Sequence, residues 1–271
     1  MRRKLGLLYL LAASALWGGI GVIVQTLVPN ERGVPLAVLI RSLSASALLL
    51  ARLRFVMRGE AVVMGLISSA FYSVYVLTIV VEGTSISAAM LYTAPAFIVG
   101  YELLRGRKVT SVDYVATGLT VAGVMIIYNA ELLTLYTALG LLSGFTYSLL
   151  IYYSSIMQAR GFAEWDIIAA QSLWSLPPLL LASLTFWEFT AEVAAAGVLL
   201  GVVETVVAYY FFYKGMREVG PLASSLLTSL EPVFAMVYAY LILAQVLTPI
   251  QYLGASLIIL SSALTALRSA R

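Results

Sequence analysis

Long apolar runs, separated by short polar connections, follow one another along the whole chain. An α-helix needs about 20 apolar residues to cross the hydrocarbon of a bilayer, and the runs approach that length. Runs such as 197–210 are continuous and do not alternate, which argues against a β-barrel. We therefore expect an all-α polytopic membrane protein with ten transmembrane helices. The expected spans are residues 5–28, 34–53, 61–81, 84–104, 112–128, 133–157, 167–186, 193–213, 221–243 and 249–267.

The composition agrees with this pattern and removes several function classes. Only 11% of the 271 residues are charged, whereas soluble domains carry about 25%. With 62% apolar residues, the chain has too little polar surface for a soluble enzyme, a disordered segment or a nucleic-acid-binding protein. It has no cysteine and no histidine, which excludes thiol catalysis, imidazole bases and His-ligated metals. We expect no enzyme activity, no cofactor and no metal.

The basic residues fall almost entirely on one side of this topology. With the N-terminus in the cytoplasm, 14 of the 16 Lys and Arg lie in cytoplasmic segments, Arg32 lies on the other side, and Arg41 lies within a span. A missed or additional span would destroy the asymmetry. It therefore predicts a multi-pass protein of the plasma membrane with both termini cytoplasmic. Residues 2–4 and 13–15 also fit a signal peptide, but the apolar run continues to residue 28, which favours an uncleaved helix.

The chain also matches itself, at a spacing of about 137 residues and of about 130 for the first helices. Because five spans is an odd number, a second copy inserts upside down relative to the first. We expect residues 1–130 and 131–271 to be two inverted five-helix repeats, an architecture of secondary transporters that bind solute near mid-membrane. The aligned pairs are Tyr72 with Tyr209, Pro95 with Pro232, Tyr101 with Tyr238, Trp17 with Tyr147, and Arg41 with Gln171.

Four features resemble one known family: residues 14–18 (Ser-Ala-Leu-Trp-Gly), Arg41, residues 220–224 (Gly-Pro-Leu-Ala-Ser) and residues 230–235 (Leu-Glu-Pro-Val-Phe-Ala). With the length, the spans and the duplicated halves, they make the whole chain similar to the drug/metabolite transporter superfamily, EamA type. Ala244 and Gln245 depart from the Gly-Glu pair that commonly follows the ninth helix in that family. The resemblance implies movement of small organic metabolites, often export of amino acids or related compounds, through a central cavity.

Two carboxylates fall near the middle of expected spans. Glu204 lies about ten residues from either end of the eighth span, roughly 15 Å from each surface at the helical rise. Glu231 lies at mid-depth in the ninth. A charge at that depth is costly and marks a functional site by default. We expect both to take part in proton or charge coupling; the alternative for Glu204 is a neutral carboxyl hydrogen-bonded between helices.

Arg41 and two prolines add to this set. Arg41 lies some seven residues into the second span; it either snorkels to the headgroups or pairs with a buried Glu or a substrate carboxylate, and we include it among the coupling residues. Pro95 and Pro232 occupy aligned positions, and each removes a helix hydrogen bond. As a pair they predict two kinked helices lining one cavity, although each alone also fits a kink that only shapes packing.

Aromatic and hydroxyl side chains at membrane depth complete the candidates. Ser68, Tyr72 and Tyr75 share one helix face at i, i+4 and i+7. Such side chains can bind amphipathic or cationic solutes by stacking and cation–π contacts, but ordinary helix packing explains any single one as well. The expected substrate-binding residues are Trp17, Ser68, Tyr72, Tyr75, Tyr92, Tyr147, Glu204, Tyr209 and Thr228.

These observations predict a secondary transporter that exports a small organic metabolite by alternating access. Its cavity is expected between helices one, three, four, six, eight and nine, with the lipid bilayer, the solute and protons as partners. A flippase for a lipid-linked headgroup on a related scaffold is the near alternative. An intramembrane enzyme or a sensor is the alternative from another class, and the enzyme is disfavoured because no histidine or cysteine is present.

Overall fold

The computed structural model describes residues 2–82, 90–128, 137–185 and 188–270, and all regular structure in these ranges is helical. The expected span limits at residues 84, 133 and 186 lie outside the described residues. Seven helical stretches in the described part are long and apolar enough to cross a membrane, namely Arg2–Leu27, Gly59–Val81, Ala138–Ala159, Glu164–Thr185, Ala191–Val219, Pro221–Leu243 and Pro249–Ala270. Shorter apolar helices, Val34–Leu48, Ala94–Leu104 and Ser111–Ile127, occupy three further expected spans. An all-helical multi-pass protein is thereby confirmed, while the count of ten stays a prediction.

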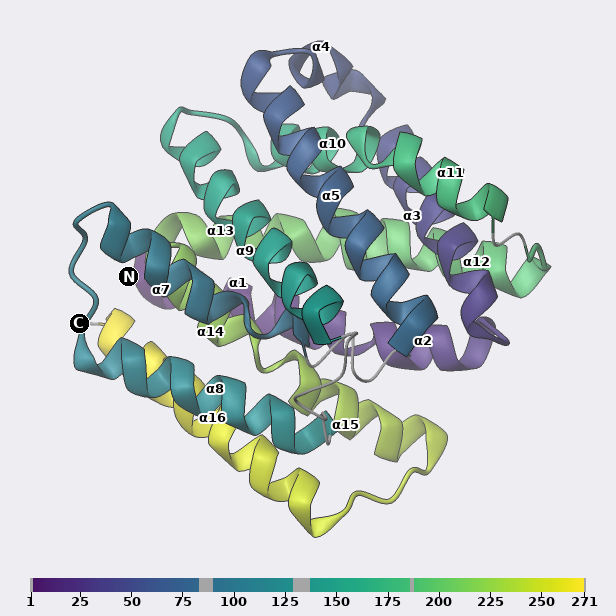
Figure 1. Cartoon of the computed structure of the whole chain (residues 1–271). Coiled ribbons are helices and arrows are strands. Elements are labelled where there is room, and N and C mark those ends of the chain that lie inside the picture. The colour runs from purple at the N-terminus through teal and green to yellow at the C-terminus, as the bar shows by residue number, and fades with distance from the viewer. Residues whose placement is uncertain (1, 83–89, 129–136, 186–187, 271) are drawn as a thin grey trace.

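Several of these stretches consist of more than one helical element (Figure 1). In chain order the elements are α1 (Arg2–Gly18), α2 (Ile20–Leu27), η1 (Glu31–Gly33), α3 (Val34–Leu48), η2 (Leu50–Arg52), α4 (Leu53–Val56), α5 (Gly59–Glu82), α7 (Ala94–Leu104), α8 (Ser111–Tyr128), α9 (Thr137–Ala159), α10 (Glu164–Trp174), α11 (Leu176–Thr185), α12 (Ala191–Leu199), η3 (Leu200–Val207), α13 (Ala208–Val219), α14 (Pro221–Thr228), α15 (Glu231–Leu243) and α16 (Pro249–Ala270). Of these, η3 is a π-helix, whose wider turn joins α12 to α13 without a break.

The interruptions occur where the sequence weakens the helix. Gly19 separates α1 from α2, and Ser175 separates α10 from α11 two residues before a Pro-Pro pair. Turns at residues 92–93 and 229–230 precede α7 and α15, and each of these helices has a proline in its first turn. Proline is tolerated there because a first-turn N–H has no helical acceptor. Since 92–93 and 229–230 are 137 residues apart, the two breaks obey the same spacing as the sequence match.

Helices from the two halves of the chain interleave. The first-half helix α5 packs on α9 and α10, α3 packs on α11, α12 and η3, and α1 packs on α13, α14 and α15. The helices α8 and α16 lie side by side along the lower edge in Figure 1. Large apolar side chains such as Leu66, Leu104 and Leu181 are exposed on the outside of the bundle, as expected where lipid is the solvent. The centre of the bundle is therefore an interface between the halves.

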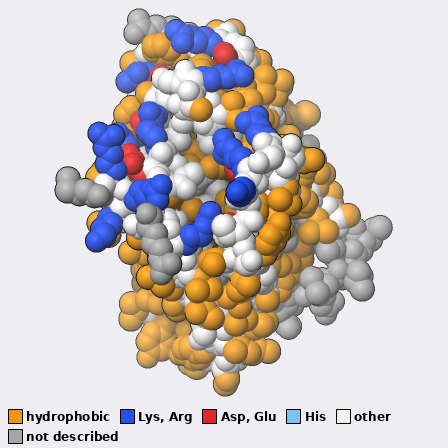
Figure 2. Space-filling view, turned by 90° about the vertical axis from the view of Figure 1, so that its left-hand side faces the viewer, with side chains coloured by type: hydrophobic (Ala, Val, Ile, Leu, Met, Phe, Trp, Pro, Cys, Tyr) orange, Lys and Arg blue, Asp and Glu red, His pale blue; other side chains and the backbone are white. Residues whose placement is uncertain are grey.

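One end of the bundle is basic and is tied together across the halves. Lys and Arg side chains gather on this end (Figure 2), where both termini also lie. Three of its ion pairs join the first half to the second: Arg52 with Asp166 at 3.4 Å, Arg160 with Glu60 at 3.2 Å, and Arg268 with Asp113. In each pair the arginine is exposed to solvent, which limits the contribution of the pair to stability, but all three pairs connect the two halves at this end. We call it the basic end and the opposite one, which carries Arg32, the Arg32 end.

Helices α8 and α16 approach closely at two glycines. A Cβ atom placed on Gly123 would lie 2.6 Å from the Gly254 carbonyl oxygen, and one on Gly254 would lie 2.5 Å from the Gly123 carbonyl oxygen. Real Cβ atoms do not approach backbone that closely, so either substitution forces the helices apart. This is the small-residue packing by which helices associate in lipid, where apolar side chains gain nothing by leaving the tails.

A leucine at Gly123 is expected to destabilise this helix pair. The forced separation of α8 from α16 should reduce the free energy of unfolding by about 1–3 kcal/mol, the usual cost of overpacking. The measurement is the melting temperature of the detergent-purified protein. Gly118→Leu is the matched control on the same helix, because a Cβ there meets nothing within 4 Å. Equal melting temperatures for Gly123→Leu and Gly118→Leu would contradict the close packing.

Candidate functional site

A cavity of about 110 Å³ lies inside the bundle, between the two halves. It extends from mid-bundle toward the Arg32 end, since Val24 in the last turn of α2 and Val34 at the start of α3 both line it. By the usual measure this volume holds several water molecules. Its lining residues are Trp17, Ile20, Val24, Val34, Val38, Arg41, Phe71, Tyr72, Tyr75, Ile79, Leu91, Tyr147, Leu200, Glu204, Tyr209 and Glu231.

Arg41 enters the cavity from α3 and does not snorkel to the surface. Its Nη2 donates a hydrogen bond of 2.6 Å to the Tyr72 hydroxyl, and its Cζ lies 4.3 Å from the centre of the same ring. No ion pair joins Arg41 to a carboxylate in the described part of the chain. Tyr72 is 4% exposed, so the guanidinium is held beside a buried aromatic face. The positive charge is thus fixed in place and still open to a solute.

Glu204 lies in the middle of the π-helix η3 and is only 4% exposed. A Cβ on Gly19 would lie 3.2 Å from Glu204 Oε1, so the carboxyl fits against the gap between α1 and α2. Glu204 Oε2 has no hydrogen-bond partner among the described residues. A buried carboxylate oxygen left unpaired is costly, which is the condition expected of a group that takes up a proton or a cationic solute.

Two side-chain hydrogen bonds hold the π-helix, one from α1 and one within η3 itself. The indole N–H of Trp17 on α1 donates to the Glu204 carbonyl oxygen at 2.8 Å, and the Thr205 hydroxyl donates to the Leu200 carbonyl at 2.9 Å. The second bond joins the Thr205 side chain to the carbonyl five residues before it, at the first residue of η3. Widened turns of this kind recur at functional sites because they present backbone oxygens and redirect side chains. Trp17 therefore anchors the segment that carries the acid.

Glu231 is the third charge on the cavity, and it enters from the first turn of α15. The break before α15 lets the residue point inward from a helix that the turn at 229–230 has redirected. Tyr92, in the aligned break before α7, lies within hydrogen-bonding reach of the Glu231 carboxyl. Glu204 interacts electrostatically with both Glu231 and Arg41 across the cavity. The break before α7 thus supplies the tyrosine, and the break before α15 positions the carboxyl that it contacts.

Aromatic rings form much of the remaining wall. Trp17 packs edge-on against Tyr209 with ring centres 5.0 Å apart. Phe71 stacks on Tyr147 at 5.1 Å and on Tyr75 at 5.6 Å. These rings exclude water and offer apolar faces with hydroxyl edges. An apolar cavity with one guanidinium and two carboxyl groups suits a small solute with separated charges and an apolar part.

Most of the residues expected from the sequence meet in this cavity. Those on its lining are Trp17, Arg41, Tyr72, Tyr75, Tyr147, Glu204, Tyr209 and Glu231. Ser68, Tyr92 and Thr228 do not line it: the Ser68 hydroxyl donates to the Gln171 carbonyl oxygen, and the Thr228 hydroxyl donates to the Ser224 carbonyl oxygen within α14. Pro95 and Pro232 are buried and are not among the lining residues either.

Sequence reasoning missed part of the lining. The expected set of spans left out the second, yet α3 contributes Val34 and Val38 as well as Arg41. Phe71 was also missed, although its ring contacts three expected rings, those of Tyr72, Tyr75 and Tyr147. Their only signal was proximity to a charged or aromatic neighbour, which does not distinguish a cavity wall from ordinary packing.

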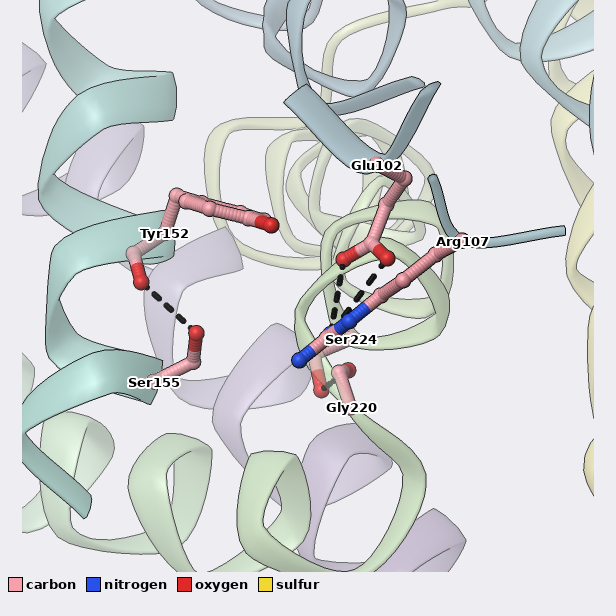
Figure 3. Close-up of polar contacts among 6 residues, drawn as sticks. All are labelled: Glu102, Arg107, Tyr152, Ser155, Gly220 and Ser224. Atoms are coloured by element: carbon pink, nitrogen blue, oxygen red, sulfur yellow. Dashed lines mark hydrogen bonds and ion pairs between the residues drawn. The ribbon is translucent and has the colours of Figure 1, made fainter. Parts of the chain in front are cut away.

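A second hollow, of about 260 Å³, lies at the basic end among α1, α7, α8, α14 and α16. There Arg107 donates to both carboxylate oxygens of Glu102 at 3.2 and 3.3 Å, beside Gly220 and Ser224 at the start of α14 (Figure 3). Asp113, which also lines it, pairs with Arg268. Because Glu102 and Asp113 are each paired with an arginine here, whereas no ion pair is found among the described charged residues that line the central cavity, the central cavity is the better candidate site.

Comparisons with known proteins agree with this picture. The family described as EamA-like transporter family matches the chain twice, at residues 4–129 and at residues 134–267. A protein of Archaeoglobus fulgidus named an uncharacterized transporter is 28% identical over 211 residues, which cover 76% of this chain and 77% of that relative. A solved structure, described only as the crystal structure of a protein, has a TM-score of 0.75 at 18% identity and covers 98% of both chains. At that identity, the last match shows the fold alone.

The Trp17 hydrogen bond leads to a stability prediction. Trp17→Phe keeps an aromatic ring but leaves the Glu204 carbonyl without its indole donor, so we expect a loss of about 0.5–1.5 kcal/mol in unfolding free energy. The measurement is again thermal unfolding in detergent. Trp165→Phe is the control, because its ring stacks on Tyr210 at 4.3 Å and the substitution preserves that stacking. If both variants melt at the same temperature, the indole bond contributes nothing.

Proposed function

The chain belongs to the EamA-like transporter family, and we propose that it is a secondary transporter, acting as an exporter of a small organic metabolite such as an amino acid or a related compound. The observation that carries this proposal is the cavity inside the bundle on which Arg41, Glu204 and Glu231 meet without forming an ion pair with one another. A guanidinium binds a carboxylate well, and a carboxylate binds an ammonium. The aromatic wall would take the apolar part of the solute.

Alternating access is the proposed mechanism. The cavity extends toward the Arg32 end, whereas the layer between it and the basic end contains fully buried side chains such as Phe212, Tyr213 and Leu150. Three ion pairs fasten the halves beyond that layer. This arrangement fits a state closed to the basic end, and movement of one half against the other would exchange the open side.

The proposed topology is ten spans, in two inverted repeats of residues 1–130 and 131–271, with both termini cytoplasmic and the protein in the plasma membrane. The two separate family matches support the division. The gathering of Lys and Arg at one end supports a cytoplasmic basic end (Figure 2). The aligned helix breaks before α7 and α15 support related halves.

Reporter fusions test this topology directly. An even number of spans with the basic end inside places an N-terminal and a C-terminal reporter both in the cytoplasm. The measurement is reporter activity of each fusion in intact cells. As an internal control, a reporter inserted beside Arg32 should report the opposite side. Termini on different sides of the membrane would rule out both ten spans and an inverted duplication.

A thermal-shift screen identifies the solute, and a transport assay with that solute comes next. Solutes that bind the folded protein raise its melting temperature. At a solute concentration of a hundred times Kd, binding adds about 2.7 kcal/mol to the free energy of unfolding. Amino acids, amines, sugars and nucleosides form the panel, and we expect solutes with both a carboxylate and an ammonium to give the shift. A shift given by lipid-linked headgroups alone would favour the flippase and contradict the proposal.

Proton coupling is tested on the two cavity carboxyls with a solute found in this screen. Glutamine keeps the shape but takes up no proton, so we expect Glu204→Gln and Glu231→Gln proteoliposomes to lose the response of transport to an imposed pH gradient. Glu192→Gln is the control, since Glu192 is exposed at the start of α12. Unchanged transport in both cavity variants at every imposed gradient would remove proton coupling from the proposal.

A further inference from the structure

A buried polar cluster lies next to the cavity on the side of the basic end. The Tyr213 hydroxyl donates to Gln171 Oε1 at 2.7 Å, the Ser154 hydroxyl donates to the Tyr213 oxygen at 3.2 Å, and the Ser68 hydroxyl donates to the Gln171 carbonyl at 3.0 Å. All four side chains are 0% exposed. They come from α5, α9, α10 and α13, so the cluster joins both halves of the chain.

The cluster continues the cavity wall along the same helix faces. Ser68 is one turn from Tyr72 on α5, Tyr213 is one turn from Tyr209 on α13, and both tyrosines 72 and 209 line the cavity. Ser154 lies two turns beyond the cavity-lining Tyr147 on α9. A polar path thus runs on from the cavity toward the basic end, closed by contact among its own side chains.

Gln171 is only partly satisfied in this closed arrangement. Its Nε2 has no hydrogen-bond partner within the described ranges, although the residue is fully buried. Exchanging the two amide atoms would leave the oxygen unpaired in its place. A buried amide without a partner costs about 1–3 kcal/mol, which packing alone does not justify when a leucine would fill the space. The group has the character of a donor that acts in another state.

The repeat identifies that state. Gln171 aligns with Arg41, and each is hydrogen-bonded to a tyrosine hydroxyl on the next span of its own half. Arg41 bonds to Tyr72, and Gln171 bonds to Tyr213, which lies one turn beyond Tyr209, the aligned counterpart of Tyr72. The Arg41 pair lines the open cavity, whereas the Gln171 pair is closed. In inverted repeats the two halves exchange conformations when access changes sides, so the second pair opens when the first closes.

We propose that Ser68, Ser154, Gln171 and Tyr213 line the half of the solute pathway that opens toward the basic end, with the Gln171 amide as the neutral counterpart of Arg41. This inference rests on the proposed function, because it requires alternating access. A solute carboxylate would then meet a full positive charge from the Arg32 end and an uncharged donor from the basic end.

Single cysteines test the proposal, and the chain contains no cysteine of its own. Ser154→Cys and Gln171→Cys are placed in right-side-out and inverted membrane vesicles and treated with a membrane-impermeant cationic methanethiosulfonate. We expect both to react only from the basic end. Their rates should be about 0.1–10% of that of a freely exposed thiol, because a minor conformation is populated to that extent. Ser261→Cys is the matched control, since Ser261 is also 0% exposed but lies between α8 and α16.

Tyr147→Cys separates this inference from the proposed function, with Phe71→Cys in its place if that variant does not fold. Both positions line the cavity and should react from either side if access alternates. Reaction there from both sides, with Ser154→Cys and Gln171→Cys unreactive or reactive from the Arg32 end, overturns the inference and leaves the transporter mechanism intact. If Tyr147→Cys, or Phe71→Cys in its place, reacts from the Arg32 end alone, alternating access itself is overturned. Equal rates at Ser154→Cys and Ser261→Cys indicate general loosening and also overturn the inference.

Discussion

Hydrocarbon offers no hydrogen bonds, and this constraint decides where the bundle can depart from α-helical geometry. Every backbone N–H and C=O at membrane depth must find a partner within the protein or in a water-filled space. The breaks at Gly19, before α7 and before α15, and the π-helix η3, each adjoin residues that line the cavity. These four irregular segments therefore gather around the cavity, whereas the break at Ser175 is not on its lining: Ser175 is buried, and its hydroxyl donates to the Ser42 hydroxyl.

The charges in the cavity are arranged so that they do not cancel. A direct ion pair between Arg41 and either carboxylate would satisfy both groups, and a solute would have to break that pair before it could bind to either of them. Instead the guanidinium is bonded to a neutral hydroxyl and lies on an aromatic face. Charges held apart in an apolar enclosure act strongly on whatever enters, because the surroundings screen them poorly. Under the proposed function, this separation leaves the guanidinium and the carboxyl groups available to the solute.

The sequence predicted the features that have a local chemical signal. Apolar length predicted the membrane-spanning helices, and proline at aligned positions predicted interruptions where α7 and α15 begin. Mid-span charge singled out Glu204 and Glu231. The π-helix had no such signal, because it is stabilised by contacts between spans, such as the Trp17 bond to the Glu204 carbonyl. Gly19 weakens the helix locally, but a glycine within an apolar run does not by itself distinguish a break from close helix packing. The partner of Arg41 was equally hidden, since its tyrosine lies 31 residues away on another helix.

The two halves share an aligned pair of helix breaks but carry different side chains at the aligned positions of Arg41 and Gln171, and this difference bears on the proposed direction of transport. If the Gln171 pair lines the pathway at the basic end, the guanidinium of Arg41 has no cationic counterpart there. A carboxylate-bearing solute is then bound more firmly in the state open to the Arg32 end than in the other. Firm binding on one side slows release to that side, so an exporter needs a force that weakens it. A proton delivered to Glu204 or Glu231 would supply this force, because it neutralises the carboxylate that holds the solute's ammonium. The two acids would then drive release of the solute as well as bind it.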